Sequence, residues 1–150
     1  SQLDLPTCIQ EIAENDVDDV HFTTLHGMPA FREAESMING PIKKSVSNFI
    51  TNEDFLVGDS PTDAEYVSIR ESHGPGSVTV TSKNIPGASP GVTGEFLLYS
   101  VATPVEDDRT IMRWSMMVSK SLEADDMGAT LIKGYSEGVN DDIPIWEEKV

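Results

Sequence analysis

The sequence predicts an α+β domain in which one curved antiparallel sheet wraps around a long C-terminal helix. Two observations lead to this prediction: a helical pattern opens the chain, and a second helical pattern closes it after a long middle region of strand patterns. Elements grouped in this way are typical of α+β folds. The chain has 150 residues, which is enough for a hydrophobic core, and we expect a single domain over 1–150.

The first helix is expected over residues 7 to about 25. Apolar residues recur in this stretch at helical spacing, namely Ile9, Ala13, Val17 and Val20. This stripe needs a sheet to pack against. A loop is expected to follow the helix and to contain Met28, Pro29 and Phe31.

Strands are expected in the middle of the chain, where Val, Thr, Ile, Tyr and Phe are concentrated between turn residues. They cover residues 44–50, 65–71, 77–82, 95–103 and 110–119. Turns are expected at 58–63, 73–76 and 106–108, and a loop at 84–94. In the last strand Met112, Trp114 and Met116 share one face. They are expected either in the core or as an apolar wall of a substrate pocket, for which soft Met side chains are suitable.

The last helix is expected to begin near Ser121. Its apolar stripe consists of Met127, Leu131, Tyr135 and Val139. Asp142 falls on the same face, and a carboxylate in a core is costly unless it is paired or bound to metal. Pro144 would kink the helix just beyond. The alternative is that Asp142 only caps a new helix that starts at Pro144.

His21 and His26 lie close together in the sequence, with Asp18 three residues before the first. Neutral imidazole is a common ligand of transition metals, so a metal site is one interpretation, and ordinary surface side chains are the other. Histidines five residues apart do not share a face of a regular helix, so the helix must loosen or end between them. Asp18 and His21 do share a face, and Asp18 could orient His21.

Residues 14–27 read Glu-Asn-x-x-Asp-x-x-His-Phe-x-x-x-His-Gly, and this pattern resembles the mononuclear iron motif of Rieske-type non-haem iron oxygenases. The resemblance implies that His21, His26 and a distant Asp hold Fe(II) as a 2-His-1-carboxylate triad. In that family the Asp precedes an Ile-Trp-Glu sequence. Asp142, followed by Ile-Pro-Ile-Trp-Glu, fits this position, and Asp141 is the fallback.

The resemblance also implies that Asp18 lies on the electron path from a neighbouring subunit's Rieske cluster. Asn15 is expected to support the site, without a firm role. Residues 103–110, followed by Arg113 and Trp114, resemble the steroid-type branch, which includes 3-ketosteroid 9α-hydroxylase oxygenase components and cholesterol 7-desaturases.

This resemblance implies a helix-grip (START-like) fold with an apolar cavity between sheet and last helix. The implied reaction is O₂-dependent hydroxylation or desaturation of a hydrophobic substrate, steroid-like or aromatic. The implied partners are that substrate and an electron source, either a Rieske domain or a ferredoxin with its reductase. The intact oxygenase is implied to be a trimer.

The amino-acid composition limits the kinds of partner and compartment that we expect. The 26 acidic and 10 basic residues give a net charge of −16, which argues against nucleic acid as a partner. No apolar run is long enough to span a membrane. The single cysteine, Cys8, indicates a reducing compartment, and we expect a cytoplasmic protein. A Rieske cluster needs two Cys and two His, so we expect no such cluster in this chain.

Two other classes of function remain open from the sequence. One is a lipid or steroid carrier of the same fold that binds a hydrophobic ligand without chemistry. The other is a zinc-dependent hydrolase, for which the triad alone would suffice and which would need neither O₂ nor a reductant.

Overall fold

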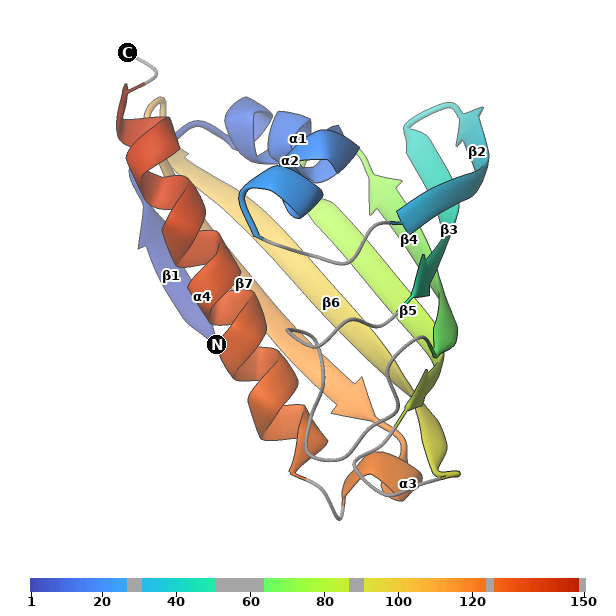
Figure 1. Ribbon diagram of the computed structural model, residues 1–150. Coiled ribbons are helices and arrows are strands. Elements are labelled where there is room, and N and C mark those ends of the chain that lie inside the picture. The colour runs from blue at the N-terminus through green and yellow to red at the C-terminus, as the bar shows by residue number, and fades with distance from the viewer. Residues whose placement is uncertain (27–30, 51–63, 87–90, 124–125, 149–150) are drawn as a thin grey trace.

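A seven-stranded antiparallel sheet curves around a long C-terminal helix in the computed structural model, which describes residues 1–26, 31–50, 64–86, 91–123 and 126–148 (Figure 1). The strand order is β1-β7-β6-β5-β4-β3-β2. The strands are β1 (Gln2–Leu5), β2 (Phe31–Asn39), β3 (Ile42–Ile50), β4 (Glu65–His73), β5 (Ser77–Pro86), β6 (Thr93–Glu106) and β7 (Arg109–Val118). The helices are α1 (Ile9–Val17), α2 (Asp19–Thr24), α3 (Lys120–Glu123) and α4 (Met127–Glu148). This is the predicted α+β, helix-grip arrangement.

The five predicted strands are β3 to β7, and β5 and β6 extend into the predicted loop at 84–94. The two edge strands, β1 and β2, are not among the predicted elements. Phe31 was predicted in a loop but begins β2, while Met28, Pro29 and the predicted turn at 58–63 lie outside the described residues. The missed β1 pairs with β7, and the Ser1 ammonium donates a hydrogen bond to the Trp114 carbonyl at 2.9 Å.

The prediction of one N-terminal helix is wrong, because the chain forms α1 and α2 with a break at Asp18. The backbone of Asp18 is extended, with φ −85° and ψ 91°, and its carboxylate accepts the Val20 N–H at 3.0 Å. An aspartate that caps the next helix in this way ends the previous one. The predicted helix end between His21 and His26 is confirmed, since α2 stops at Thr24.

The C-terminal helical segment is likewise divided. Ser121 lies in α3, where its hydroxyl donates to the Thr93 carbonyl at 2.9 Å, and α4 begins at Met127. Pro144 lies inside α4, so the alternative in which Asp142 caps a new helix is wrong. None of the helices in the described ranges is long and apolar enough to cross a membrane.

The main core lies between the sheet and helices α1 and α4. Its buried members are Leu5, Ile12, Leu98, Ala102, Met112, Trp114, Val139 and Trp146. A second cluster consists of Phe49 of β3, Tyr66 of β4 and Ile85 of β5. The main core therefore fixes α1 and α4 on the same face of the sheet, where the site described below is formed.

Gly94 allows β6 and α3 to approach closely. A Cβ at this position would lie 2.3 Å from Ser119 Oγ and 2.4 Å from Leu122 Cγ. Leu122 is 0% exposed and therefore has little room to move. The glycine is required here by packing.

We predict that Gly94→Ala lowers the free energy of unfolding by about 1–3 kcal/mol, because the added methyl group overpacks the contact with Leu122. Urea unfolding measures this change. Gly134→Ala is the matched control: no atom lies within 4 Å of that Cβ position, and alanine is favoured by about 1 kcal/mol in a helix interior. Unchanged stability in Gly94→Ala would show that β6 and α3 do not pack in this way.

Candidate metal centre

His21 is held by the break between the two short helices. Its Nδ1 is in hydrogen-bond contact with the Asp18 carbonyl oxygen. A carbonyl only accepts, so this contact places the hydrogen on Nδ1 and leaves Nε2 with a free lone pair. Nε2 is buried and has no hydrogen-bond partner among the described residues. Asp18 thus contacts His21 through its backbone, while its carboxylate caps α2.

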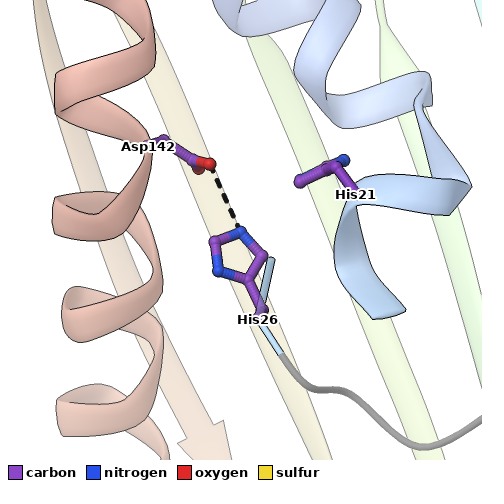
Figure 2. Close-up of side chains that lie close together, drawn as sticks. All are labelled: His21, His26 and Asp142. Carbon is purple, nitrogen blue, oxygen red and sulfur yellow. Dashed lines mark ion pairs between the residues drawn. The ribbon is translucent and has the colours of Figure 1, made fainter. Parts of the chain in front are cut away.

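His26 follows directly after α2. Its backbone N–H donates to the His21 carbonyl at 3.4 Å, so the two histidines are also connected through the main chain. The His26 ring lies against α4 at Gly138, where an added Cβ would be 3.6 Å from Nδ1. Its Nε2 faces Asp142 Oδ1 at 3.4 Å (Figure 2).

Asp142 is only 5% exposed, as its place on the apolar stripe predicted. Asn15 in α1 donates a hydrogen bond from Nδ2 to Asp142 Oδ2 at 2.8 Å. Oδ1 is buried without a hydrogen bond in the described part of the chain. Burial raises the pKa of Asp142 above its ordinary value of 3.8, and the two histidines and Asn15 oppose this rise.

The three side chains point toward one another from α2, the segment after it, and α4 (Figure 2). One ligand atom from each of His21, His26 and Asp142 lies within 4.8 Å of the others. Asp141 is exposed and does not belong to this cluster. Two imidazoles and one carboxylate are the donor set of facial-triad Fe(II) sites. Buried polar atoms without hydrogen bonds are rare and costly. Within the described ranges His21 Nε2 and Asp142 Oδ1 are two such atoms, and a divalent cation between them would satisfy both.

The predicted pocket residues lie beside this cluster, in the core. Met112 and Trp114 are buried, and Met116 packs against them from the same face of β7. The Trp114 ring meets Tyr135 of α4 edge to face, with centroids 5.5 Å apart. Contact with a substrate remains a prediction for these residues. His73, at the end of β4, is exposed and outside the cluster.

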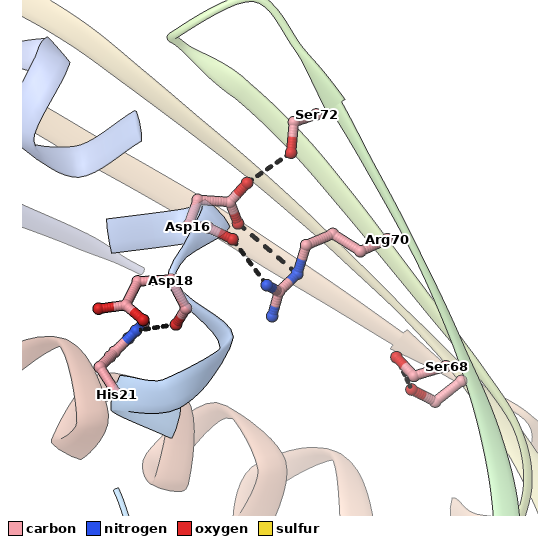
Figure 3. A network of polar contacts seen from close by, with 7 residues as sticks. Asp16, Asp18, His21, Ser68, Arg70 and Ser72 are labelled. Carbon is pink, nitrogen blue, oxygen red and sulfur yellow. Dashed lines mark hydrogen bonds and ion pairs between the residues drawn. The ribbon is translucent and has the colours of Figure 1, made fainter. Parts of the chain in front are cut away.

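Asp16 and Arg70, which are absent from the residues predicted by sequence, connect α1 to β4 next to the site (Figure 3). The alternation of Ser68, Arg70 and Ser72 along one strand was the available signal. These residues share a face, and that face points toward α1 and α2 because Arg70 and Ser72 both contact Asp16.

Residues 1–150 match the family described as 3-Ketosteroid 9alpha-hydroxylase C-terminal domain, so the match covers the whole chain. No match to a curated protein sequence was found. Among solved structures, a conserved protein from Geobacillus kaustophilus is similar, with a TM-score of 0.58. The alignment covers 95% of this chain and 92% of that one at 14% identity, and it therefore supports the fold alone.

The raised pKa of Asp142 predicts a pH dependence of the metal-free protein. The folded state holds this proton more tightly than the unfolded chain does, so stability is greatest below the ordinary pKa and falls as pH rises through the raised one. Asp142→Asn removes this dependence and can still accept the Asn15 hydrogen bond. The variant should therefore be more stable than the wild type at neutral pH in the presence of a chelator.

Urea unfolding at a series of pH values, from below the ordinary carboxyl pKa up to neutral pH, measures this difference. Glu147→Gln, at an exposed position of the same helix, is the control and should leave the pH dependence unchanged. A gap between Asp142→Asn and wild type that stays constant with pH would contradict the prediction.

Proposed function

Because the chain belongs to the family of 3-ketosteroid 9α-hydroxylase C-terminal domains, we propose that it is the catalytic domain of a Rieske-type non-haem iron oxygenase. The proposed reaction is O₂-dependent hydroxylation or desaturation of a hydrophobic, steroid-like substrate. One observation carries the proposal: one ligand atom from each of His21, His26 and Asp142 lies within 4.8 Å of the others, around a buried carboxylate.

In this proposal His21, His26 and Asp142 hold Fe(II). The bound ion would supply open coordination positions where O₂ is activated. Asp18 and Asn15 orient two of these ligands. The Asp18 carbonyl selects the His21 tautomer, and the Asn15 amide occupies Asp142 Oδ2, which leaves Oδ1 for the ion. In this proposal Asn15 is a positioning residue for the Asp142 carboxylate.

The proposed substrate lies along the apolar face formed by Met112, Trp114 and Met116. Support comes from the composition of this face, where methionine and aromatic side chains of the core gather beside α4. Such a wall would exclude water and would favour a ligand with little polar surface. Trp114 Nε1 is a buried donor without a partner in the described structure, and it would be available to an oxygen of the ligand.

Electrons would enter at Asp18. Its side chain is exposed, while its carbonyl contacts the ring of His21. It therefore connects the protein surface to the proposed ligand set within one residue. A Rieske protein, or the Rieske domain of a neighbouring subunit, would dock at this point.

A carrier of hydrophobic ligands would share the sheet and the apolar wall. It has no need, however, for a buried carboxylate beside two imidazoles, and these groups make a carrier less stable rather than more. Metal binding is therefore the measurement that separates the two functions.

We predict that the chain binds about one Fe(II), or Co(II) as a substitute, and that His26→Ala and Asp142→Ala each abolish this binding because they leave only two donors. Anaerobic titration calorimetry and metal analysis measure the stoichiometry. His73→Ala, which changes an exposed histidine, should bind as the wild type does. Full affinity in both triad variants would exclude this metal centre.

We also predict that product forms from a sterol-like substrate with NADH and O₂ only when a Rieske protein and its reductase are added. In that complete system Asp18→Asn should retain the fold and the iron, because asparagine caps a helix as well as aspartate does, yet turnover should be severely slowed. Product analysis by chromatography follows both reactions.

Two results would count against this second prediction. Turnover by the chain alone would mean that the electron source is misassigned, and product formed without O₂ would favour the hydrolase. Normal turnover in Asp18→Asn would remove that residue from the electron path.

A further inference from the structure

The break at Asp18 raises the question of what holds α2 in place. Helix α2 has six residues, which is too short to be stable without tertiary contacts. Val20 is exposed, and so is Leu25 after the helix end. The orientation of His21 must therefore be maintained by a contact from elsewhere in the fold.

Arg70 of β4 reaches one side of this break. Its Nη1 donates a hydrogen bond to the Asp16 carbonyl at 2.7 Å, and its Nε lies 3.6 Å from Asp16 Oδ1 (Figure 3). Ser72, two residues further along the strand, donates to Asp16 Oδ2. The Arg70 and Asp16 side chains are only 21% and 15% exposed, so solvent screens this pair less than a surface ion pair.

The same guanidinium reaches the other side of the break. Its Cζ lies 4.3 Å from the centroid of the Phe22 ring, a cation–π arrangement. The Phe22 ring in turn lies 4.0 Å from the ring of His21 and 6.1 Å from that of His26, measured between centroids. Arg70 thus contacts residues before and after Asp18 at once, and it supports both imidazoles through Phe22.

We propose that Arg70 is a positioning residue for the metal centre: it fixes the angle between α1 and α2 and thereby the direction of the His21 and His26 rings. The inference rests on the proposed function, since it needs a metal at the triad. The fork of arginine is essential to this role, because its Cζ lies over the Phe22 ring while its Nη1 and Nε reach Asp16. Lysine would keep the charge but could not make both contacts.

The test is a titration of the full chain with Co(II), followed by the visible absorption of the bound ion, which reports the geometry of its ligands. Arg70→Lys should weaken Co(II) binding about 10-fold or more and shift the absorption bands, as loss of an orienting partner does at other metal sites. Phe22→Leu keeps the Asp16 contacts, removes the stacking, and should act in the same direction.

Arg109→Lys is the matched control. Arg109 also makes a forked pair with a carboxylate, with Nε and Nη2 at 2.9 Å and 2.6 Å from Asp4, but it contacts β1 rather than α1 or α2. Its Co(II) affinity and spectrum should equal those of the wild type. Circular dichroism checks that each variant folds, and if Arg70→Lys does not, Phe22→Leu provides the same readout.

Wild-type Co(II) affinity and spectrum in Phe22→Leu and in folded Arg70→Lys would overturn the inference. A lowered melting temperature with unchanged metal binding would overturn it too, because Arg70 would then serve the fold alone. If the wild-type chain itself binds no Co(II), the proposed metal centre fails first, and the role of Arg70 fails with it.

Discussion

The buried carboxylate of Asp142 is the constraint on which the rest of the site depends. A charge in the interior must be paired or ligated, and this chain already carries a net charge of −16. The Asp142 carboxylate has three polar neighbours. They are Asn15 from α1, His21 from α2 and His26 from the segment after α2. Each of these partners comes from the other end of the chain. The sheet must therefore hold α1 and α4 at a fixed separation.

The break at Asp18 makes this convergence possible. A continuous helix could not turn Asn15, His21 and His26 toward one carboxylate. His21 would lie about 120° around the axis from Asn15, and His26 about 16 Å further along it. Asp18 ends α1, caps α2 and offers its carbonyl to His21, so that one residue redirects the chain and orients a donor. Arg70 and Phe22 then fix the new direction against the sheet.

The sequence was sufficient for the fold class, for the five inner strands and for the burial of Asp142, because hydrophobic periodicity determines all three. It was insufficient for β1 and β2. Strand β1 has only four residues, and its partner β7 lies more than a hundred positions away in the sequence. Strand β2 pairs with β3 in a local hairpin, but polar residues at five of its nine positions interrupt the apolar pattern of a strand. The break at Asp18 was also missed, since no Gly or Pro marks it. Arg70 was missed because it lies among serines, while the apolar Val67 and Ile69 of the same strand point to the opposite face.

The residues of the site come from both ends of the chain, and their long separation in sequence affects how the molecule folds. Strands β2 to β7 each pair with their neighbour in sequence, so the strand pairs of this meander are local. The pairing of β1 with β7 and the Asn15–Asp142 hydrogen bond instead join residues more than a hundred positions apart. We therefore expect the polar cluster to form after the meander, and opening of α4 alone would disrupt the cluster while the meander persists. A cation bound by the cluster would disfavour that opening. It would thereby protect the amides of α4 from hydrogen exchange, although α4 lies outside the meander.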